Sequence, residues 1–457
     1  MKLIKKTHLI AMLFLLVLSL IFSACRPKAL PAEGRATATP TSADPTLALE
    51  STSSLPILPT PTPNLSGNPI QVSEMQYFQQ GTRLTVIAKL INTLSTGSIR
   101  DVQLEILALD ATGARIAQAY DEIKFIFAGE TTGVVRQFDL QADVYAKKTE
   151  VRVNGGYIDQ NNTYAQPFSF SIPTFFGGAD VPVMTGWLHN RDTVTYTEVI
   201  LNAVAYNGRG EIIGGGRSLV EFVPGEDRLG VSIPSNFIGQ PEKVELYAWL
   251  GPHSAALQPG SWWNAVQVKD WNFVISPTNQ VAGGAEWVNT TDQTLRKTWY
   301  IVTVYDANGQ VNLVNKGFID RLWPNETVNF APPLAFAPSD STPTHVDLIV
   351  VPGEFGQPVL AYNPLRASQA IIEFPDNQPL GKVTMVNNLN ARISDAIVML
   401  TVRNRNGSFV GSGFVSTGPL DGSSSAIISV PVFIMPPYDG LFINASVIIP
   451  DGAKFGE

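Results

Sequence analysis

The chain has one cysteine, Cys25, and four histidines, so few of its side chains could act as nucleophiles or metal ligands. A single thiol excludes disulfides within the chain and zinc sites built on cysteine pairs. His189, His253 and His345 lie far apart in the sequence, and no HExxH pattern accompanies them. We therefore expect no metal site, no cofactor and no enzymatic activity, and we expect these histidines to be structural or at the surface.

Three further patterns could carry chemistry, but a structural role is the simpler interpretation of each. Gly411-Ser412-Gly413 lacks the spacing of a nucleophile elbow and falls where a strand is expected. Gly214-Gly215-Gly216 opens no helix, which favours a bulge or a tight sheet edge over a phosphate cradle. Asp306 to Gly309 begins like a calcium loop, but the downstream acidic ligand is absent.

Aromatic clustering gives the sharper hypothesis. All eight tryptophans lie between Trp187 and Trp323, and Trp262, Trp263 and Trp271 gather within one short stretch. Exposed indole rings offer flat apolar faces and an N–H donor, with which they can hold a sugar or a partner protein. The alternative is that these rings pack a junction between two domains and stiffen it. We take the three clustered residues as the candidate contact with an unknown glycan or protein partner.

The residues before Cys25 give this cysteine a context. Lysines in the first six residues precede an apolar run from Leu9 to Phe22, and Ser23-Ala24 follows. These are the parts of a secretory signal, and the run is short for a bilayer span. The stretch resembles a bacterial lipoprotein signal, although Phe22 stands where that family usually has an aliphatic residue. An ordinary signal peptide and an uncleaved membrane anchor are the alternatives.

The resemblance implies an extracytoplasmic protein that is attached to a membrane through a lipid on Cys25. We expect residues 1–24 to be the signal peptide. Residues 25–68 should form a disordered Pro/Thr/Ser-rich linker, because this composition cannot bury enough apolar surface to order the chain. The net charge of −8, with no basic tract in the body of the chain, makes nucleic acid a poor partner.

Beyond the linker the sequence repeats. Four turns mark the period, each with Asp or Asn three residues before a glycine, and successive glycines lie 97, 99 and 98 residues apart. This pairing suits a type I turn, in which the Asx side chain caps the turn and glycine accepts a positive φ. The pairs are Asp110 and Gly113, Asn207 and Gly210, Asp306 and Gly309, and Asn404 and Gly407. Asn92, Asn190, Asn289 and Asn387 recur in step with these turns.

Within each repeat the apolar residues alternate, as in strands with one buried face. About seven short strands per repeat are typical of an immunoglobulin-like sandwich. We therefore predict an all-β chain of four tandem immunoglobulin-like β-sandwich domains, at residues 69–160, 167–252, 265–353 and 367–452. The outer face is polar in the first repeat, at Gln103 and Glu105, but apolar at Ile301 in the third and Met399 in the fourth. Something should cover that face in the last two repeats.

The third repeat carries a family resemblance. Its segment from Trp299 to Gly309, followed by Pro324-Asn325-Glu326, resembles an FxLYD domain, a small β-sandwich module of extracytoplasmic bacterial and archaeal proteins. The second repeat matches through Tyr206-Asn207, whereas Leu109 and Arg403 replace the tyrosine in the first and fourth. The resemblance implies a sandwich fold and no particular activity. We expect a membrane-anchored, non-enzymatic interaction or scaffold protein, with carbohydrate binding at the tryptophan-rich junction as the alternative.

Overall fold

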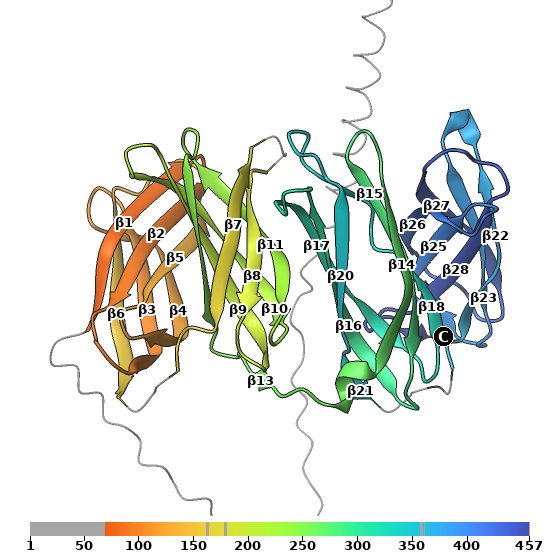
Figure 1. The fold of residues 1–457 in the computed structure, drawn as a ribbon, viewed down its shortest axis with the longest axis horizontal. Helices are drawn as coiled ribbons and strands as arrows, with labels where there is room; N and C mark the ends of the chain where they lie inside the picture. The colour runs from red at the N-terminus through yellow and green to blue at the C-terminus, as the bar shows by residue number, and fades with distance from the viewer. Residues whose placement is uncertain (1–68, 161–163, 178–180, 357–359, 361, 457) are drawn as a thin grey trace, which may run out of the picture. The chain divides into compact units, whose positions relative to one another are not determined.

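The computed structural model describes residues 69–160, 164–177, 181–356, 360 and 362–456. Cys25 and the predicted signal and linker lie outside the described residues. The described chain is all-β, with four tandem immunoglobulin-like sandwiches and two short 3-10 turns (Figure 1). Among the described helices none has the length and apolar character needed to cross a membrane.

Each sandwich, called copy 1 to copy 4 below, has six principal strands. Its first, second and fifth strands pair as the front sheet, and its third, fourth and sixth pair as the back sheet; the two sheets are separate in copies 1 and 3 and joined in copies 2 and 4. With their short strands included, the four copies have six, seven, eight and eight strands, close to the expected number of about seven, although single strands reach 13 residues. Copy 1 contains β1 (Ile70–Gln80), β2 (Arg83–Asn92), β3 (Ser98–Leu109), β4 (Arg115–Phe127), β5 (Thr131–Asp139) and β6 (Lys148–Asp159).

The other copies repeat this order and add short strands at their margins. Copy 2 contains β7 (Phe168–Phe176), β8 (Val183–Asn190), β9 (Thr195–Tyr206), β10 (Ile212–Val223), β11 (Arg228–Phe237), β12 (Lys243–Leu250) and the short β13 (Ala256–Leu257). Copy 3 contains β14 (Val266–Ile275), β15 (Gln280–Asn289), β16 (Thr294–Tyr305), β17 (Val311–Leu322), β18 (Thr327–Phe330) and β20 (His345–Val351), with β19 (Ala335–Phe336) and β21 (Glu354–Gly356) as short strands. Copy 4 contains β22 (Leu365–Glu373), β23 (Leu380–Asn387), β25 (Ala396–Arg403), β26 (Phe409–Thr417), β27 (Ser425–Ile434) and β28 (Phe442–Ile448), with β24 (Arg392–Ile393) and β29 (Phe455–Gly456) as short strands.

Polar residues at fixed positions hold the loops of every copy. Each predicted turn has its Asx side chain accepting backbone N–H bonds, as Asp110 Oδ1 does from Thr112 and Ala114, and its glycine has a positive φ. The recurring asparagine at the end of the second strand is buried in all four copies. In copy 3, Asn289 Nδ2 donates to the carbonyls of Leu322 and Trp323, which ties that strand to the later turn.

Glycine runs distinguish copies 2 and 4 from copies 1 and 3. Gly214 to Gly216 lie where β10 pairs with both β9 and β11, so that the two sheets of copy 2 join into one. A Cβ at Gly214 would lie 2.1 Å from Phe237 Cβ, which explains why glycine stands there. Gly411 and Gly413 serve the same junction between β26 and β27 in copy 4. These runs are close backbone approaches, not ligand cradles.

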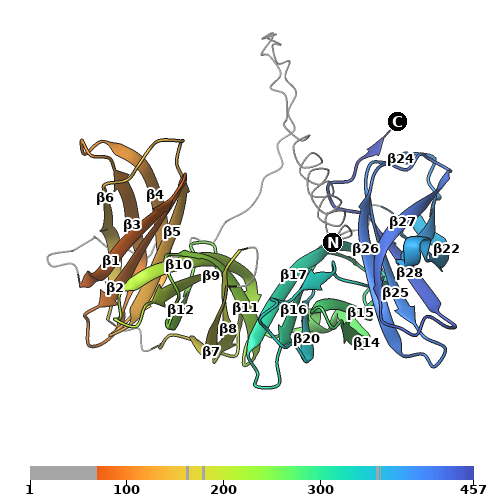
Figure 2. The same cartoon turned by 90° about the horizontal axis from the view of Figure 1, so that it is seen from above.

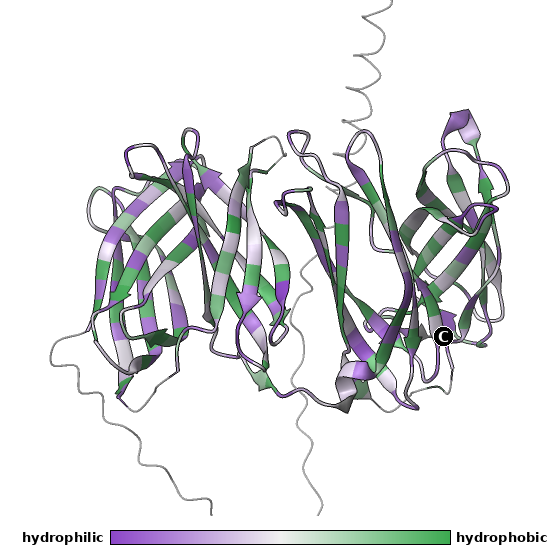
Figure 3. Cartoon of the chain, in the orientation of Figure 1, coloured by the Kyte–Doolittle hydropathy of each residue, from purple (hydrophilic) through white to green (hydrophobic). Residues whose placement is uncertain are grey.

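The sandwiches pack on one another through sheet faces. The back sheet of each later copy lies on the front sheet of the copy before it: β9 and β10 contact β5, β16 and β17 contact β11, and β26 contacts β14 and β15. Both views show this alternation (Figures 1 and 2). Apolar and polar residues alternate along the strands, so one strand can serve its own core and a neighbouring copy (Figure 3). The predicted cover for copies 3 and 4 is thus the preceding copy.

A close glycine contact recurs at each of these three interfaces. A Cβ at Gly133 of copy 1 would lie 2.4 Å from the Tyr247 ring of copy 2. At Gly230 of copy 2 it would lie 2.2 Å from Thr303 Cγ2, and at Gly284 of copy 3 it would lie 2.5 Å from the Phe409 ring. The front sheet of the earlier copy therefore lacks a side chain where the later copy inserts one.

Candidate functional site

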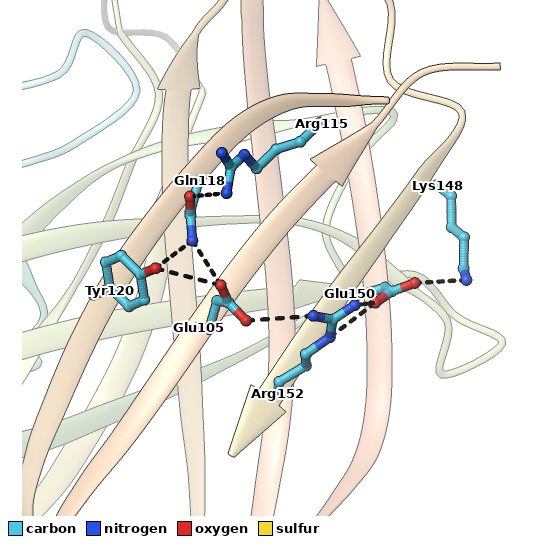
Figure 4. A network of polar contacts seen from close by, with 7 residues as sticks. All are labelled: Glu105, Arg115, Gln118, Tyr120, Lys148, Glu150 and Arg152. Carbon is cyan, nitrogen blue, oxygen red and sulfur yellow. Dashed lines mark hydrogen bonds and ion pairs between the residues drawn. The ribbon is translucent and has the colours of Figure 1, made fainter. Parts of the chain in front are cut away.

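The outer face of the first back sheet is a network of charged and polar side chains (Figure 4). Glu105 accepts from Gln118 at 2.6 Å and pairs with Arg152 at 3.5 Å. Arg152 also pairs with Glu150 at 2.5 Å, and Glu150 accepts from Lys148 at 2.7 Å. These contacts lie at the surface, where ion pairs contribute little stability but keep a sheet face soluble.

The strand position that Glu105 occupies in copy 1 has other residues in copies 2 to 4, where the preceding copy covers the back sheet. Asn202 is fully buried, and its Oδ1 accepts the backbone N–H of Val135 across the interface of copies 1 and 2 at 2.9 Å. Ile301 is 1% exposed and belongs to the apolar cluster of copy 2. Met399 is 2% exposed and belongs to the cluster of copy 3. The cores are thus shared across the copy boundaries.

The structure separates the three tryptophans that the sequence grouped together. Trp262 and Trp263 lie in a 3-10 turn, η1 (Ser261–Asn264), with their rings 4.9 Å apart in an edge-to-face pair. Both are half-buried against the apolar cluster centred on copy 2. Trp271 packs on the cluster of copy 3, with its ring over Gly283. The pair therefore lies at the junction of copies 2 and 3, and Trp271 lies elsewhere.

The histidines lie in three separate environments. His189 Nε2 and Ser171 Oγ are 2.7 Å apart, and burial, assisted by Arg228 and Arg191, lowers the histidine pKa. No described carboxylate bonds the other ring nitrogen, so this pair lacks the third member of a catalytic triad. His345 stacks on Tyr305 at 5.1 Å, and His253 is exposed in a loop after β12. In the described part of the chain no cluster of acidic, histidine or cysteine side chains could hold a metal ion.

A groove that no sequence motif predicted lies where copy 1 meets copy 2. Its volume is about 570 Å³. Copy 1 supplies side chains of β3, β4 and β6, and copy 2 supplies β9, β10 and the loop after β12. The polar lining residues are Gln103, Tyr120, Asp121, Glu122, Asn154, Glu198, Arg217 and His253. Because these residues come from two copies, no local motif could have identified the groove.

An ion pair fixes the inner wall of this groove. Arg217 of copy 2 donates to both carboxylate oxygens of Asp121 in copy 1, at 2.6 and 2.9 Å. Arg136 approaches the same carboxylate at 3.5 Å, and the Arg217 guanidinium lies 5.2 Å from the centre of the Trp249 ring. A bidentate pair held over an aromatic ring sets the two copies in one register at the groove.

Two copy junctions share a glutamate clamp. Glu130 accepts from the backbone N–H of Phe127 and from Gln166 in the linker to copy 2. Glu326 accepts likewise from Trp323 and from Asn363 in the linker to copy 4. Burial raises the pKa of Glu130 and of Glu326 to about 7. The glutamate at this turn of copy 2, Glu226, is exposed, so the junction of copies 2 and 3 is built differently.

Comparisons with known proteins do not identify this chain. No family model matches it, and no curated protein is similar to it. Among solved structures, the chain is similar to native E. coli alpha-2-macroglobulin at 10% identity and a TM-score of 0.11, over 80% of this chain and 27% of that one. Dimeric latent PorU from Porphyromonas gingivalis is similar at 10% identity and a TM-score of 0.14, over 85% of this chain and 33% of that one. A mutant Salmonella alpha-2-macroglobulin is similar at 12% identity and a TM-score of 0.12, over 82% of this chain and 29% of that one. The chain thus spans a third or less of those proteins, and likeness at these scores carries no conclusion about it.

Proposed function

We propose that this protein is a non-enzymatic interaction or scaffold protein, held outside the cytoplasm by a lipid on Cys25. The observation that supports a scaffold role is the sharing of apolar cores between successive copies, with Ile301 and Met399 each packed into the preceding copy. Shared cores hold neighbouring sandwiches in a fixed register, which suits a protein that presents surfaces to partners.

The anchor part of this proposal rests on the sequence around Cys25. Its test is a Cys25→Ser variant expressed in the native host and fractionated beside the parent chain. The parent should be found in the membrane pellet, with an acylated N-terminal peptide by mass spectrometry. The variant should lose the acyl mass and leave the pellet or stay unprocessed. An unmodified Cys25 in the parent would contradict the lipid anchor.

The scaffold part is tested on the full chain after mild detergent extraction. Partners held by the sandwiches should copurify in a fixed ratio and persist through a wash that removes loosely bound proteins. A substrate turned over by groups from several copies, each of them needed, would refute the non-enzymatic role.

A second candidate function is carbohydrate binding by Trp262 and Trp263. The half-buried edge-to-face pair leaves part of each ring accessible at a junction, which is the observation in its favour. Replacing both residues with alanine, in a chain that still unfolds cooperatively, should abolish retention on a sugar column. Tryptophan fluorescence that acrylamide does not quench, and that no added sugar quenches, would contradict this candidate.

A further inference from the structure

The groove between copies 1 and 2 combines a fixed aromatic ring with unused polar groups. Tyr120 lines the groove and is 67% exposed. Gln118 and Glu105 both contact its hydroxyl, as Figure 4 shows, so the ring is held in one orientation. An exposed, oriented aromatic face is a surface on which the C–H face of a sugar ring can stack.

Several polar side chains around this ring have no partner within the described residues. The side chains around this ring that make neither a hydrogen bond nor an ion pair with a described residue are those of Gln103, Glu122, Asn154, Glu198 and His253. Two of these side chains, those of Glu122 and Glu198, are carboxylates. The neighbouring side chains Glu105, Glu150 and Arg152 on the same sheet are fully engaged with one another. Free donors and acceptors are thus concentrated at the groove, where a ligand could satisfy them.

The charge of the lining limits the kind of ligand. Asp121 is neutralised by Arg217, which leaves Glu122 and Glu198 as acceptors without a cation. Two such carboxylates favour ligands that donate through hydroxyl or ammonium groups and repel anionic ones. The volume of about 570 Å³ lies in the range of small-ligand sites.

We propose that this groove binds a neutral or amine-bearing oligosaccharide, with one sugar ring stacked on Tyr120 and its hydroxyl or ammonium groups bonded to Glu122 and Glu198. The site lies apart from the Trp262 and Trp263 pair, and it adds a small-ligand function to the proposed scaffold. The two sandwiches together form it, because copy 1 supplies the ring and Glu122 and copy 2 supplies Glu198 and His253.

The test is calorimetric titration of the full chain with three sugar trimers that differ in charge. Glucosamine trimer carries ammonium groups, N-acetylglucosamine trimer is neutral, and galacturonic acid trimer is anionic. At least one of the first two should bind, and more tightly than the acid trimer. Tyr120→Ala should weaken this binding by about tenfold or more, which corresponds to the loss of one stacked ring.

Two further variants make the result specific. Glu122→Gln combined with Glu198→Gln keeps the shape of the groove and should weaken the amine-bearing trimer more than the neutral one. Tyr145→Ala removes another exposed tyrosine of copy 1, outside the groove, and should leave binding unchanged. Equal binding by the parent chain, Tyr120→Ala and the double variant would overturn the proposal. So would failure of both non-acidic trimers to bind at about 5 mM, or stronger binding of the acid trimer.

Failure here is distinguishable from failure of the other proposals. Loss of sugar binding in the Trp262 and Trp263 alanine variant, with binding intact in Tyr120→Ala, would place the sugar at the tryptophan pair and overturn the groove site. The membrane anchor is read out by the acyl mass on Cys25, which no groove variant changes.

Discussion

The outer face of the back sheet is the same surface in every copy, but it meets water in copy 1 and protein in copies 2 to 4. At one strand position copy 1 has Glu105, whose carboxylate pairs with Arg152, whereas copies 3 and 4 have the buried Ile301 and Met399. Asn202 of copy 2 is intermediate, because it is buried but polar and bonds the neighbouring backbone. The polarity of the residue at this position therefore depends on whether water or a neighbouring copy lies against the sheet.

The largest effect should follow from exchanging the two kinds of residue. Ile301→Glu or Met399→Glu would bury a charge without a partner and should cost about 3–5 kcal/mol of unfolding free energy. Glu105→Ile, the reverse change on the uncovered face, should cost less than about 1 kcal/mol. Urea denaturation of the three variants measures the difference. Equal costs in all three would mean that Ile301 and Met399 are not covered.

Smaller but clear losses should come from filling the glycine contacts. Gly133→Ala and Gly230→Ala would place a methyl group against Tyr247 and Thr303, and each should cost about 1–3 kcal/mol through overpacking. Gly418→Ala is the matched control, because nothing lies within 4 Å of its added Cβ. Thermal unfolding of the three variants tests this. A Gly418→Ala variant as unstable as the others would contradict the interface explanation.

A comparable loss should follow at the polar position of copy 2. Asn202→Ala would leave the buried N–H of Val135 without its acceptor, at a cost of about 1–3 kcal/mol. Amide hydrogen exchange at Val135 should accelerate in this variant, whereas exchange in copy 4 should not change. Unaltered exchange at Val135 would show that the two copies do not meet there.

A different kind of effect, a dependence of stability on pH, should arise at the clamped junctions. Since burial raises the pKa of Glu130 and Glu326 to about 7, well above the usual pKa of a glutamate side chain, the folded chain binds more protons than the unfolded chain in the pH range between the two values. The stability that these two protonated carboxyl groups contribute is complete below about pH 4.5 and is lost as the pH rises through about 7. Glu130→Gln with Glu326→Gln should flatten the stability profile in this window. Glu226→Gln, at the exposed turn of copy 2, is the control and should leave the slope unchanged.

The sequence contained most of the fold because its signals are local. The Asx and glycine pairs, such as Asp110 with Gly113, set the period, and alternation set the strands. Strand length was not predicted, because turn spacing does not show how far a strand continues past its pairing partner. The apolar outer faces at Ile301 and Met399 predicted a cover without naming it.

The site was harder to predict because it depends on contacts between copies. Trp262 and Trp263 do form a pair, but Trp271, which is close in sequence, packs in another core. The groove joins Tyr120 of one copy to Glu198 and His253 of the next, and no spacing rule brings these residues together. The Glu130 and Glu326 clamps are likewise visible only once their linkers are placed.

The most direct test of face-to-face stacking is a disulfide across the interface of copies 2 and 3. An ideal Cβ at Gly230 lies 3.0 Å from Thr303 Cβ, about 0.5 Å inside the usual separation in disulfides, so that a small shift of the two strands apart brings the pair into bonding range. In the full chain under mild oxidation, Gly230→Cys with Thr303→Cys should form the 230–303 bond nearly completely, as read by peptide mass spectrometry. Gly230→Cys with Glu105→Cys, on the uncovered face of copy 1, should form none. Absence of the 230–303 bond, or equal bonding in the control pair, would contradict the stacking of the copies.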